Sequence, residues 1–231
     1  MKPQIRQITP LLYEFGWDSD ISDNLLQQQL GFKELIEHEF NRWIEELRLG
    51  YKTLVIVLSR PLEAAVVNHW VRSIREEELS WQLPDRIWKI PVCYSPSTGR
   101  DLENIIVQKN INREELIFMH SQPLYRIHFF GFLPGFMYLN GLNEKLHTPR
   151  KSIPDRMVPS GSVAIGGAQT GIYPTSSPGG WHLIGQTPIS TFDPAQKKPV
   201  FASIGERITF MPISEREFNR IKMKSEMPRS I

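Results

Sequence analysis

The sequence predicts an α+β fold, in which a small N-terminal domain of mixed helices and strands precedes a C-terminal domain of short β-strands. In the first half, helical spacing alternates with a continuous β-branched run. Between Ser121 and Ser214, helical spacing nearly vanishes, and short apolar runs are instead broken by glycine and proline. Ten of the 15 glycines lie between Gly131 and Gly185. Many short strands with regular turn signals are typical of a β-sandwich or barrel.

Composition also differs between the two halves. Five of the 6 tryptophans lie at or before Trp88, and residues 1–90 carry 11 basic and 14 acidic side chains although the whole chain is slightly basic. A chain of 231 residues fits one or two domains. We place the boundary within residues 80–86, which gives domains 1–84 and 85–231.

Strands are expected where short apolar or β-branched runs are bounded by turn residues. Thr53–Leu58 is the clearest, because it is continuous and β-branched, as buried strands are. The last residues, Lys222–Ile231, are expected to fray as a tail. The predicted strands are Leu11–Phe15, Thr53–Leu58, Ile87–Val92, Arg126–Phe130, Ser162–Ile165, His182–Ile184, Val200–Ser203 and Arg207–Met211.

Helices are expected where a capping residue precedes apolar positions three and four apart. Capping residues up to Ser22 predict the start of one helix, with Gly31 as a stop or kink. Its apolar positions continue with helical spacing as far as Leu47. Residues 61–79 form a second predicted helix, with proline at its first position. Arg113–Ser121 is a short third helix.

Charge and cysteine content exclude several classes. With 27 basic and 25 acidic residues the net charge is +2, which argues against a dedicated nucleic-acid binder. The single cysteine, Cys93, cannot form an internal disulfide or a cysteine-based metal cluster. The longest aliphatic run, Leu54–Leu58, is far short of the roughly 20 residues that span a bilayer, and no secretory signal is evident. We expect a cytoplasmic protein that binds neither nucleic acid nor membranes.

The segment most typical of a binding site is Met157–Phe192, 36 residues without a charged side chain in a chain that is 23% charged. Its hydroxyls, amides and glycines could hydrogen-bond a small polar ligand. The alternative is a β-barrel whose turns require these residues. Within the segment, Gly179 and Gly180 could form an anion-binding nest, and Arg150 just upstream could neutralise a phosphate or carboxylate.

Familiar catalytic signatures are missing. No histidine pair has metal-ligand spacing, and neither a phosphate-binding loop nor a G-x-S-x-G motif is present, so a stand-alone hydrolase is not supported. We therefore predict no metal ligands. Among the histidines, His120 ends the third helix and is a candidate for acid–base chemistry, whereas His128 lies within a predicted strand and is expected to pack there.

Four motifs in the second half are distinctive: FGFLPGFMYL at Phe130–Leu139, VPSGSV at Val158–Val163, QTGIYP at Gln169–Pro174 and SPGGW at Ser177–Trp181. In this order and spacing they resemble the KipI/PxpB family, also described as allophanate hydrolase subunit 1-like and related to carboxyltransferase-domain subunits. The dense resemblance covers His120–Pro212, and residues 1–90 match thinly but in the right order.

The resemblance implies a small N-terminal α/β domain followed by a cyclophilin-like β-barrel. It also implies that Glu45–Leu49 is a strand instead of a helical continuation. The chain departs from the family at Tyr94–Arg100, where relatives tend to carry a glycine- and acid-containing loop. It also lacks the family's proline-containing turn near Tyr51.

The function implied is that of the B-type subunit of an ATP-dependent 5-oxoprolinase, which converts 5-oxo-L-proline to L-glutamate. Such a subunit acts with a C-type (allophanate hydrolase subunit 2-like) partner and a separate A-type subunit, and is inactive alone. ATP and Mg²⁺ would be bound by the complex, without assignment to residues of this chain. The alternative is a KipI-like inhibitor of a sporulation histidine kinase, antagonised by a KipA-like partner. A prolyl isomerase rests on fold analogy alone.

The resemblance also implies site residues. Phosphorylating the lactam oxygen demands positioning and charge neutralisation from the protein more than covalent chemistry. We expect His120 to transfer a proton and Arg150 to stabilise charge. Substrate-binding residues are then Gln169, Thr170, Tyr173, Gly179, Gly180 and Trp181. The aromatic residues of Phe129–Tyr138 either line a subunit contact or plug the barrel.

Overall fold

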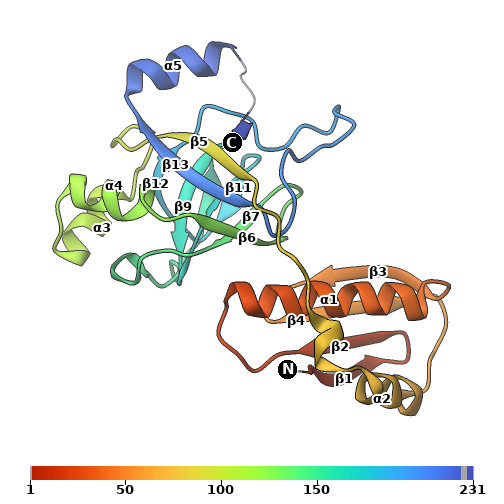
Figure 1. Ribbon diagram of the computed structural model, residues 1–231. Coiled ribbons are helices and arrows are strands. Elements are labelled where there is room, and N and C mark those ends of the chain that lie inside the picture. The colour runs from red at the N-terminus through yellow and green to blue at the C-terminus, as the bar shows by residue number, and fades with distance from the viewer. Residues whose placement is uncertain (1, 225–227, 231) are drawn as a thin grey trace. The chain divides into compact units, whose positions relative to one another are not determined.

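The computed structural model describes residues 2–224 and 228–230. The chain divides into two compact units, one ending at Leu83 and the other beginning at Pro84 (Figure 1). Each unit has its own hydrophobic core, and each is described separately below.

The N-terminal unit is a four-stranded antiparallel sheet of order β1-β2-β4-β3 covered by helices. Helix α1 begins where the Ser22 hydroxyl accepts a hydrogen bond from the backbone N–H of Leu25. Gly31 lies inside this helix, where an added Cβ would be 2.5 Å from the carbonyl oxygen of Leu79, so glycine allows the close approach of η1. The elements of this unit are β1 (Gln4–Thr9), β2 (Leu12–Gly16), α1 (Asp23–Phe40), β3 (Ile44–Leu49), β4 (Thr53–Leu58), α2 (Ala64–Ser73) and the 3₁₀ helix η1 (Glu76–Leu79).

The C-terminal unit is a closed barrel of seven strands, in the order β12-β9-β10-β7-β6-β13-β5. The ring closes where Gln186 of β12 pairs with Cys93 of β5. Strand β14 adds to the outer edge of β5. The elements are β5 (Ile87–Cys93), α3 (Leu102–Lys109), α4 (Arg113–Ser121), β6 (Tyr125–Phe130), β7 (Met137–Asn140), η2 (Glu144–Leu146), β8 (Asp155–Val158), β9 (Ser162–Gly166), β10 (Gln169–Ile172), β11 (Ser177–Gly179), β12 (His182–Gln186), β13 (Arg207–Ile213), α5 (Glu215–Lys224) and β14 (Arg229–Ser230).

Side chains of the barrel strands alternate between two apolar clusters. Met137 and Leu139 point into the barrel core, as do Val163 and Ile165. A second, smaller cluster lies on the outside of β7, β9 and β10 and is covered by the two-stranded sheet of β8 and β11. This outer cluster positions the site described below. Its buried members are Phe136, Val158, Ala164, Tyr173, Trp181 and Leu183.

The α+β fold with a C-terminal barrel is confirmed, as are strand Thr53–Leu58 and helix Arg113–Ser121. The prediction that the first helix continues to Leu47 is wrong. Residues 44–49 form strand β3, as the family resemblance implied, because pairing with β4 overrides the helical spacing.

Two further expectations are wrong. The predicted helix 61–79 is a helix from Ala64 to Ser73 followed by the separate η1. The predicted strand Val200–Ser203 is a loop with one isolated bridge, between Val200 and Phe192. Residues 225–227 and 231 of the predicted frayed tail lie outside the described residues, whereas helix α5 extends into that tail as far as Lys224.

Candidate functional site

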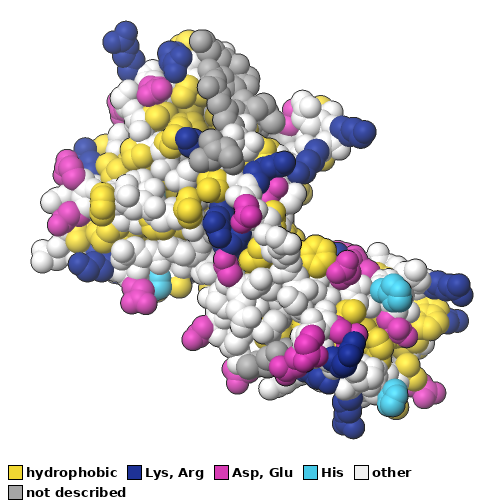
Figure 2. Space-filling view, viewed as in Figure 1, with side chains coloured by type: hydrophobic (Ala, Val, Ile, Leu, Met, Phe, Trp, Pro, Cys, Tyr) yellow, Lys and Arg dark blue, Asp and Glu magenta, His cyan; other side chains and the backbone are white. Residues whose placement is uncertain are grey.

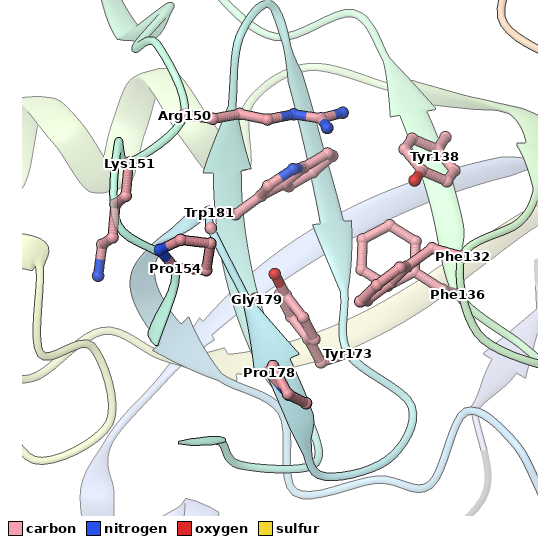
Figure 3. Close-up of a pocket in the computed structure, with 11 residues that line it drawn as sticks. Phe132, Phe136, Tyr138, Arg150, Lys151, Pro154, Tyr173, Pro178, Gly179 and Trp181 are labelled. Carbon is pink, nitrogen blue, oxygen red and sulfur yellow. The ribbon is translucent and has the colours of Figure 1, made fainter. Parts of the chain in front are cut away.

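A pocket of about 330 Å³ opens on the outer side of the barrel, against β7 and beside β11 (Figure 3). Its volume falls at the lower end of the range of about 300–1,000 Å³ typical of small-molecule sites. Most of its wall is aromatic, with two cations at one end. The lining residues are Phe132, Phe136, Tyr138, Arg150, Lys151, Pro154, Tyr173, Pro178, Gly179, Gly180 and Trp181.

The aromatic wall is built around Phe136. Its ring meets those of Tyr173 and Trp181 edge-on, with centroids 5.1 and 5.4 Å apart, and the Tyr138 ring lies 5.7 Å from that of Trp181. Burial raises the pKa of the Tyr138 hydroxyl and of the Tyr173 hydroxyl, while the nearby Arg150 charge opposes the rise. Both hydroxyls are therefore protonated at neutral pH and can donate hydrogen bonds.

Glycines in the barrel strands allow these rings to lie directly on the backbone. A Cβ at Gly166 would be 2.4 Å from ring atoms of Trp181, and one at Gly171 would be 3.0 Å from the Phe136 ring. Because residues two apart in a strand share a face, the small residues of β9 and β10 form a flat floor for the outer cluster.

Arg150 provides the available positive charge. Its guanidinium lies over the Trp181 ring, 5.6 Å from the centroid, in a cation–π arrangement (Figure 3). The side chain is exposed, and it makes no ion pair or hydrogen bond with another described residue. It can therefore accept a carboxylate or phosphate without breaking an existing contact.

Lys151 differs from its neighbour, because its charge is already neutralised. The Nζ atom lies 2.7 Å from a carboxylate oxygen of Asp101 and 2.7 Å from one of Asp155. In Figure 3 its side chain extends away from that of Arg150. Of the two pocket cations, only Arg150 offers an unpaired charge to a ligand.

Gly179 and Gly180 both line the pocket. Neither has a positive φ, which an anion-binding nest requires at one of its residues, so the nest interpretation is wrong. Gly179 is required for another reason: an added Cβ would be 2.3 Å from the hydroxyl oxygen of Tyr173. The Gly180 carbonyl accepts a hydrogen bond from the backbone N–H of Lys151.

His120 lies inside the barrel and not at the pocket. It is fully buried, and its ring stacks on Phe210 with centroids 4.7 Å apart. Nδ1 is 2.7 Å from the Tyr94 hydroxyl and Nε2 is 2.9 Å from the Thr170 hydroxyl. Because the Thr170 hydroxyl donates to the Ala164 carbonyl, it must accept from Nε2–H, and Tyr94 then donates to Nδ1.

Burial lowers the pKa of His120 to about 3, so its imidazole is neutral. With both ring nitrogens bonded and no exposed surface, the proton-transfer role predicted for His120 has no geometric support. Thr170, its partner, likewise points into the barrel and does not contact the pocket.

Gln169 is buried on the outer face of β10, because it lies two residues before Gly171 and pairs with Gly166, on which Trp181 packs. Its Nε2 has no hydrogen-bond partner among the described residues. It lies beneath the aromatic wall and is not one of the lining residues.

Five of the eight predicted site residues therefore share one pocket: Arg150, Tyr173, Gly179, Gly180 and Trp181. The sequence interpretation missed the contribution of Asp101 and Asp155, since neither lies in a recognisable motif. The aromatic segment before Leu139 was noted as a contact surface or a barrel plug. The structure shows that Phe136 and Tyr138 lie outside the barrel, in the pocket wall.

Two classes of site can be compared with the described residues directly, namely metal centres and membrane-spanning helices. No group of three His, Cys, Asp or Glu side chains within residues 2–224 and 228–230 could hold a metal ion. No helix in the same residues is long and apolar enough to cross a bilayer. On the face drawn in Figure 2, positive and negative side chains are interspersed over each unit, which is unlike the continuous basic surface of a nucleic-acid binder.

Known proteins are similar to this chain in both sequence and fold. A protein of Bacillus subtilis (strain 168), named as the B-type subunit of 5-oxoprolinase, is 38% identical over 177 residues, which are 76% of this chain and 72% of the relative. An Escherichia coli O157:H7 protein of the same name is 39% identical over 72% of this chain and 77% of its own length.

Among solved structures, that of TTHA0988 superimposes with a TM-score of 0.74 at 26% identity over 91% of this chain. The matched region is only 40% of the TTHA0988 chain, so there the same fold is part of a longer polypeptide.

Residues 3–202 match the family described as the carboxyltransferase domain, subdomain C and D. The chain belongs to this carboxyltransferase-domain family.

Proposed function

We propose that this chain is the B-type subunit of an ATP-dependent 5-oxoprolinase, and that its pocket is one wall of the 5-oxoproline site. The observation that carries the proposal is the unpaired guanidinium of Arg150 above an aromatic wall. The names of the curated relatives support the reaction and favour it over inhibition of a histidine kinase.

The substrate fits this chemistry. 5-Oxoproline is a small five-membered lactam that carries one carboxylate. Its carboxylate can pair with the Arg150 guanidinium through two parallel hydrogen bonds. Its ring can lie against Trp181 and Tyr138, whose faces form the neighbouring wall. The protonated hydroxyls of Tyr138 and Tyr173 can donate to polar atoms of the ring.

The reaction requires that ATP phosphorylate the lactam oxygen, after which water opens the ring to glutamate and releases phosphate. This chain's residues would bind and orient the lactam. They do not fit a magnesium site, because the two carboxylates nearest the pocket, Asp101 and Asp155, are both paired with Lys151. We therefore assign no metal ion to this chain.

A partner subunit is proposed to complete the site. Three apolar side chains are largely exposed: Phe132, which lines the pocket, by 59%, and Ile153 and Met157, which flank the lining residue Pro154 just before and within β8, by 81% and 60%. Exposed apolar side chains that gather around a pocket are typical of a contact surface. The related fold in TTHA0988 belongs to a longer chain, and the relatives are named as subunits. A C-type subunit covering this face, with an A-type subunit in the complex, fits these observations.

The test is reconstitution of the complex and measurement of 5-oxoproline-dependent ATP hydrolysis. The complex is expected to be active and the isolated chain inactive. Arg150→Met, which keeps an apolar stem over Trp181, is expected to raise KM for 5-oxoproline about ten- to a hundredfold, because hydrogen bonds to charged groups contribute about 1.5–3 kcal/mol.

Arg156→Met is the matched control, because Arg156 is an exposed cation on β8 that does not line the pocket. Its KM is expected to equal that of the wild type. A reconstituted complex without oxoproline-dependent hydrolysis, or an Arg150→Met complex with unchanged KM, would refute the proposal.

A further inference from the structure

Lys151, which lines the pocket, belongs to a cluster of four charged side chains with Asp101, Asp155 and Arg100. Lys151 pairs with the carboxylates of Asp101 and Asp155, as described above. The guanidinium of Arg100 lies 2.5 Å from the Asp155 carboxylate. The side chains of Lys151, Asp101 and Asp155 are only 15, 11 and 24% exposed. Two positive and two negative charges balance, so the cluster adds no net charge to the pocket.

The cluster joins segments that are far apart in the sequence. The Asp101 carboxylate also accepts a hydrogen bond from the backbone N–H of Leu183 in β12, while the Asp101 N–H donates to the Leu183 carbonyl. Asp155 lies in β8, opposite Gly179 of β11. The backbone N–H of Lys151 donates to the Gly180 carbonyl. Lys151 thus contacts the start of α3, strand β8 and Gly180 in the pocket wall, and Asp101 extends this set of contacts to β12.

Asp101 takes an unusual role for its position. It is the residue before the first turn of α3, where aspartate ordinarily caps the helix, but its side chain makes no capping hydrogen bond. Its carboxylate is directed to Lys151 and Leu183 instead. The helix therefore lacks the stabilisation of a side-chain cap, and the carboxylate makes long-range contacts instead. This indicates that Asp101 serves to fix the position of Lys151.

We propose that Asp101 and Asp155 are positioning residues, which act through Lys151 to hold the loop that places Arg150 over Trp181. Lys151 and Arg150 are adjacent, so the backbone that the cluster fixes is the backbone from which the guanidinium extends. The cluster also removes Lys151 as a competing anion site. A role for this geometry in substrate binding rests on the proposed function, whereas the placement of Arg150 does not.

The first experiment observes Arg150 directly in the full-length chain. The Nε–Hε resonance of Arg150 is expected to be shifted upfield by the ring current of Trp181 in the wild type. Lys151→Met and Asp101→Asn are expected to move it towards the position of a free arginine, while Lys151→Arg, which can still pair with both carboxylates, retains most of the shift. Asp155→Asn provides a second route if either variant fails to fold.

Glu103→Gln is the matched control, because Glu103 lies in the first turn of α3, two residues after Asp101, and pairs with Arg113, which does not line the pocket. Its Arg150 resonance is expected to be unchanged. If the resonance also stays unchanged in folded Lys151→Met, Asp101→Asn and Asp155→Asn, the positioning role is refuted.

The second experiment measures the reconstituted complex. Lys151→Met is expected to raise KM for 5-oxoproline about tenfold with little change in kcat, since a displacement of about 1 Å in a positioning group can cost up to a hundredfold. Lys151→Arg is expected to restore most of the loss. A shifted Arg150 resonance with wild-type KM would support the positioning role and refute the assignment of the pocket to 5-oxoproline.

Discussion

Arg150 and Lys151 show how two adjacent cations take different roles. Lys151 is held by two carboxylates and is largely buried, whereas Arg150 is exposed and lies over an aromatic ring. The sequence interpretation selected Arg150 as the charge-stabilising residue. The contact of Lys151 with Asp101 was not predictable, because the two residues are 50 positions apart and Asp101 carries no local signal of the contact.

His120 was predicted to be an acid–base residue because histidine is the usual one. The spacing of its helix, however, also indicates that this histidine is buried. Leu116 and His120 are four residues apart in α4, and both are buried on the helix face that packs against the barrel. A histidine in register with a core leucine is expected to be a bonded core residue. The hydroxyls of Tyr94 and Thr170 supply its partners from other elements, which the sequence alone does not bring together.

We predict that the imidazole of His120 stays neutral, with the proton on Nε2, from neutral pH down to about pH 4. Burial lowers its pKa to about 3, so the folded state resists the proton that an unfolded chain takes up near pH 6.5. His120 therefore contributes stability that is present above about pH 6.5 and is lost as pH falls towards 3. Nitrogen-15 NMR of the ring measures both properties, and titration near pH 6.5 would show that His120 is accessible to solvent after all.

At the scale of elements, strands β9 and β10 act as a smooth support for the aromatic wall. Their glycines were interpreted from the sequence as turn or ligand-contact residues. The structure shows that Gly166 and Gly171 are needed because Trp181 and Phe136 pack on them. Ring placement of this kind depends on tertiary packing, which local sequence patterns do not specify.

We predict that Gly166→Ala displaces the Trp181 indole, because the added Cβ would lie 2.4 Å from its ring atoms. Overpacking of this kind costs about 1–3 kcal/mol, so the melting temperature is expected to fall and KM for 5-oxoproline to rise. Gly16→Ala is the control, since its Cβ would meet nothing within 4 Å. Equal melting temperatures and KM values for the two variants would contradict the packing argument.

The stability that the Asp155–Lys151 ion pair contributes is predicted to depend on pH. Burial alone would raise the pKa of Asp155, but the hydrogen bond and charge of Lys151, together with Arg100, outweigh it and hold the pKa below its ordinary value. The carboxylate thus contributes stability that is present above the unfolded pKa of about 3.9 and is lost as pH falls through the lower folded value.

The expected outcome is that Asp155→Asn melts at a lower temperature than the wild type at pH 7. This difference should shrink as pH falls below about 4, because the wild-type carboxylate then becomes protonated. Differential scanning calorimetry of the two proteins between pH 7 and pH 2 provides the comparison. A difference that is independent of pH would show that the ion pair does not stabilise the fold.

At the scale of the whole molecule, the sequence predicted a fold of mixed helices and strands followed by a short-strand barrel, because glycine and tryptophan are unevenly distributed and helical spacing stops after Ser121. It did not predict that the site lies outside the barrel. Strand alternation assigns residues to two faces, but which face is covered by a further layer depends on where β8 and β11 pack. The part of the site that we propose a partner supplies cannot be predicted from this sequence.

The most direct measurement is a crystal structure of the reconstituted complex with 5-oxoproline. The account predicts that the ligand carboxylate lies within hydrogen-bond distance of the Arg150 guanidinium and that its ring lies against Trp181 and Tyr138, with the partner subunit closing the opposite side. Binding of 5-oxoproline at a place that does not include Arg150 would contradict the account.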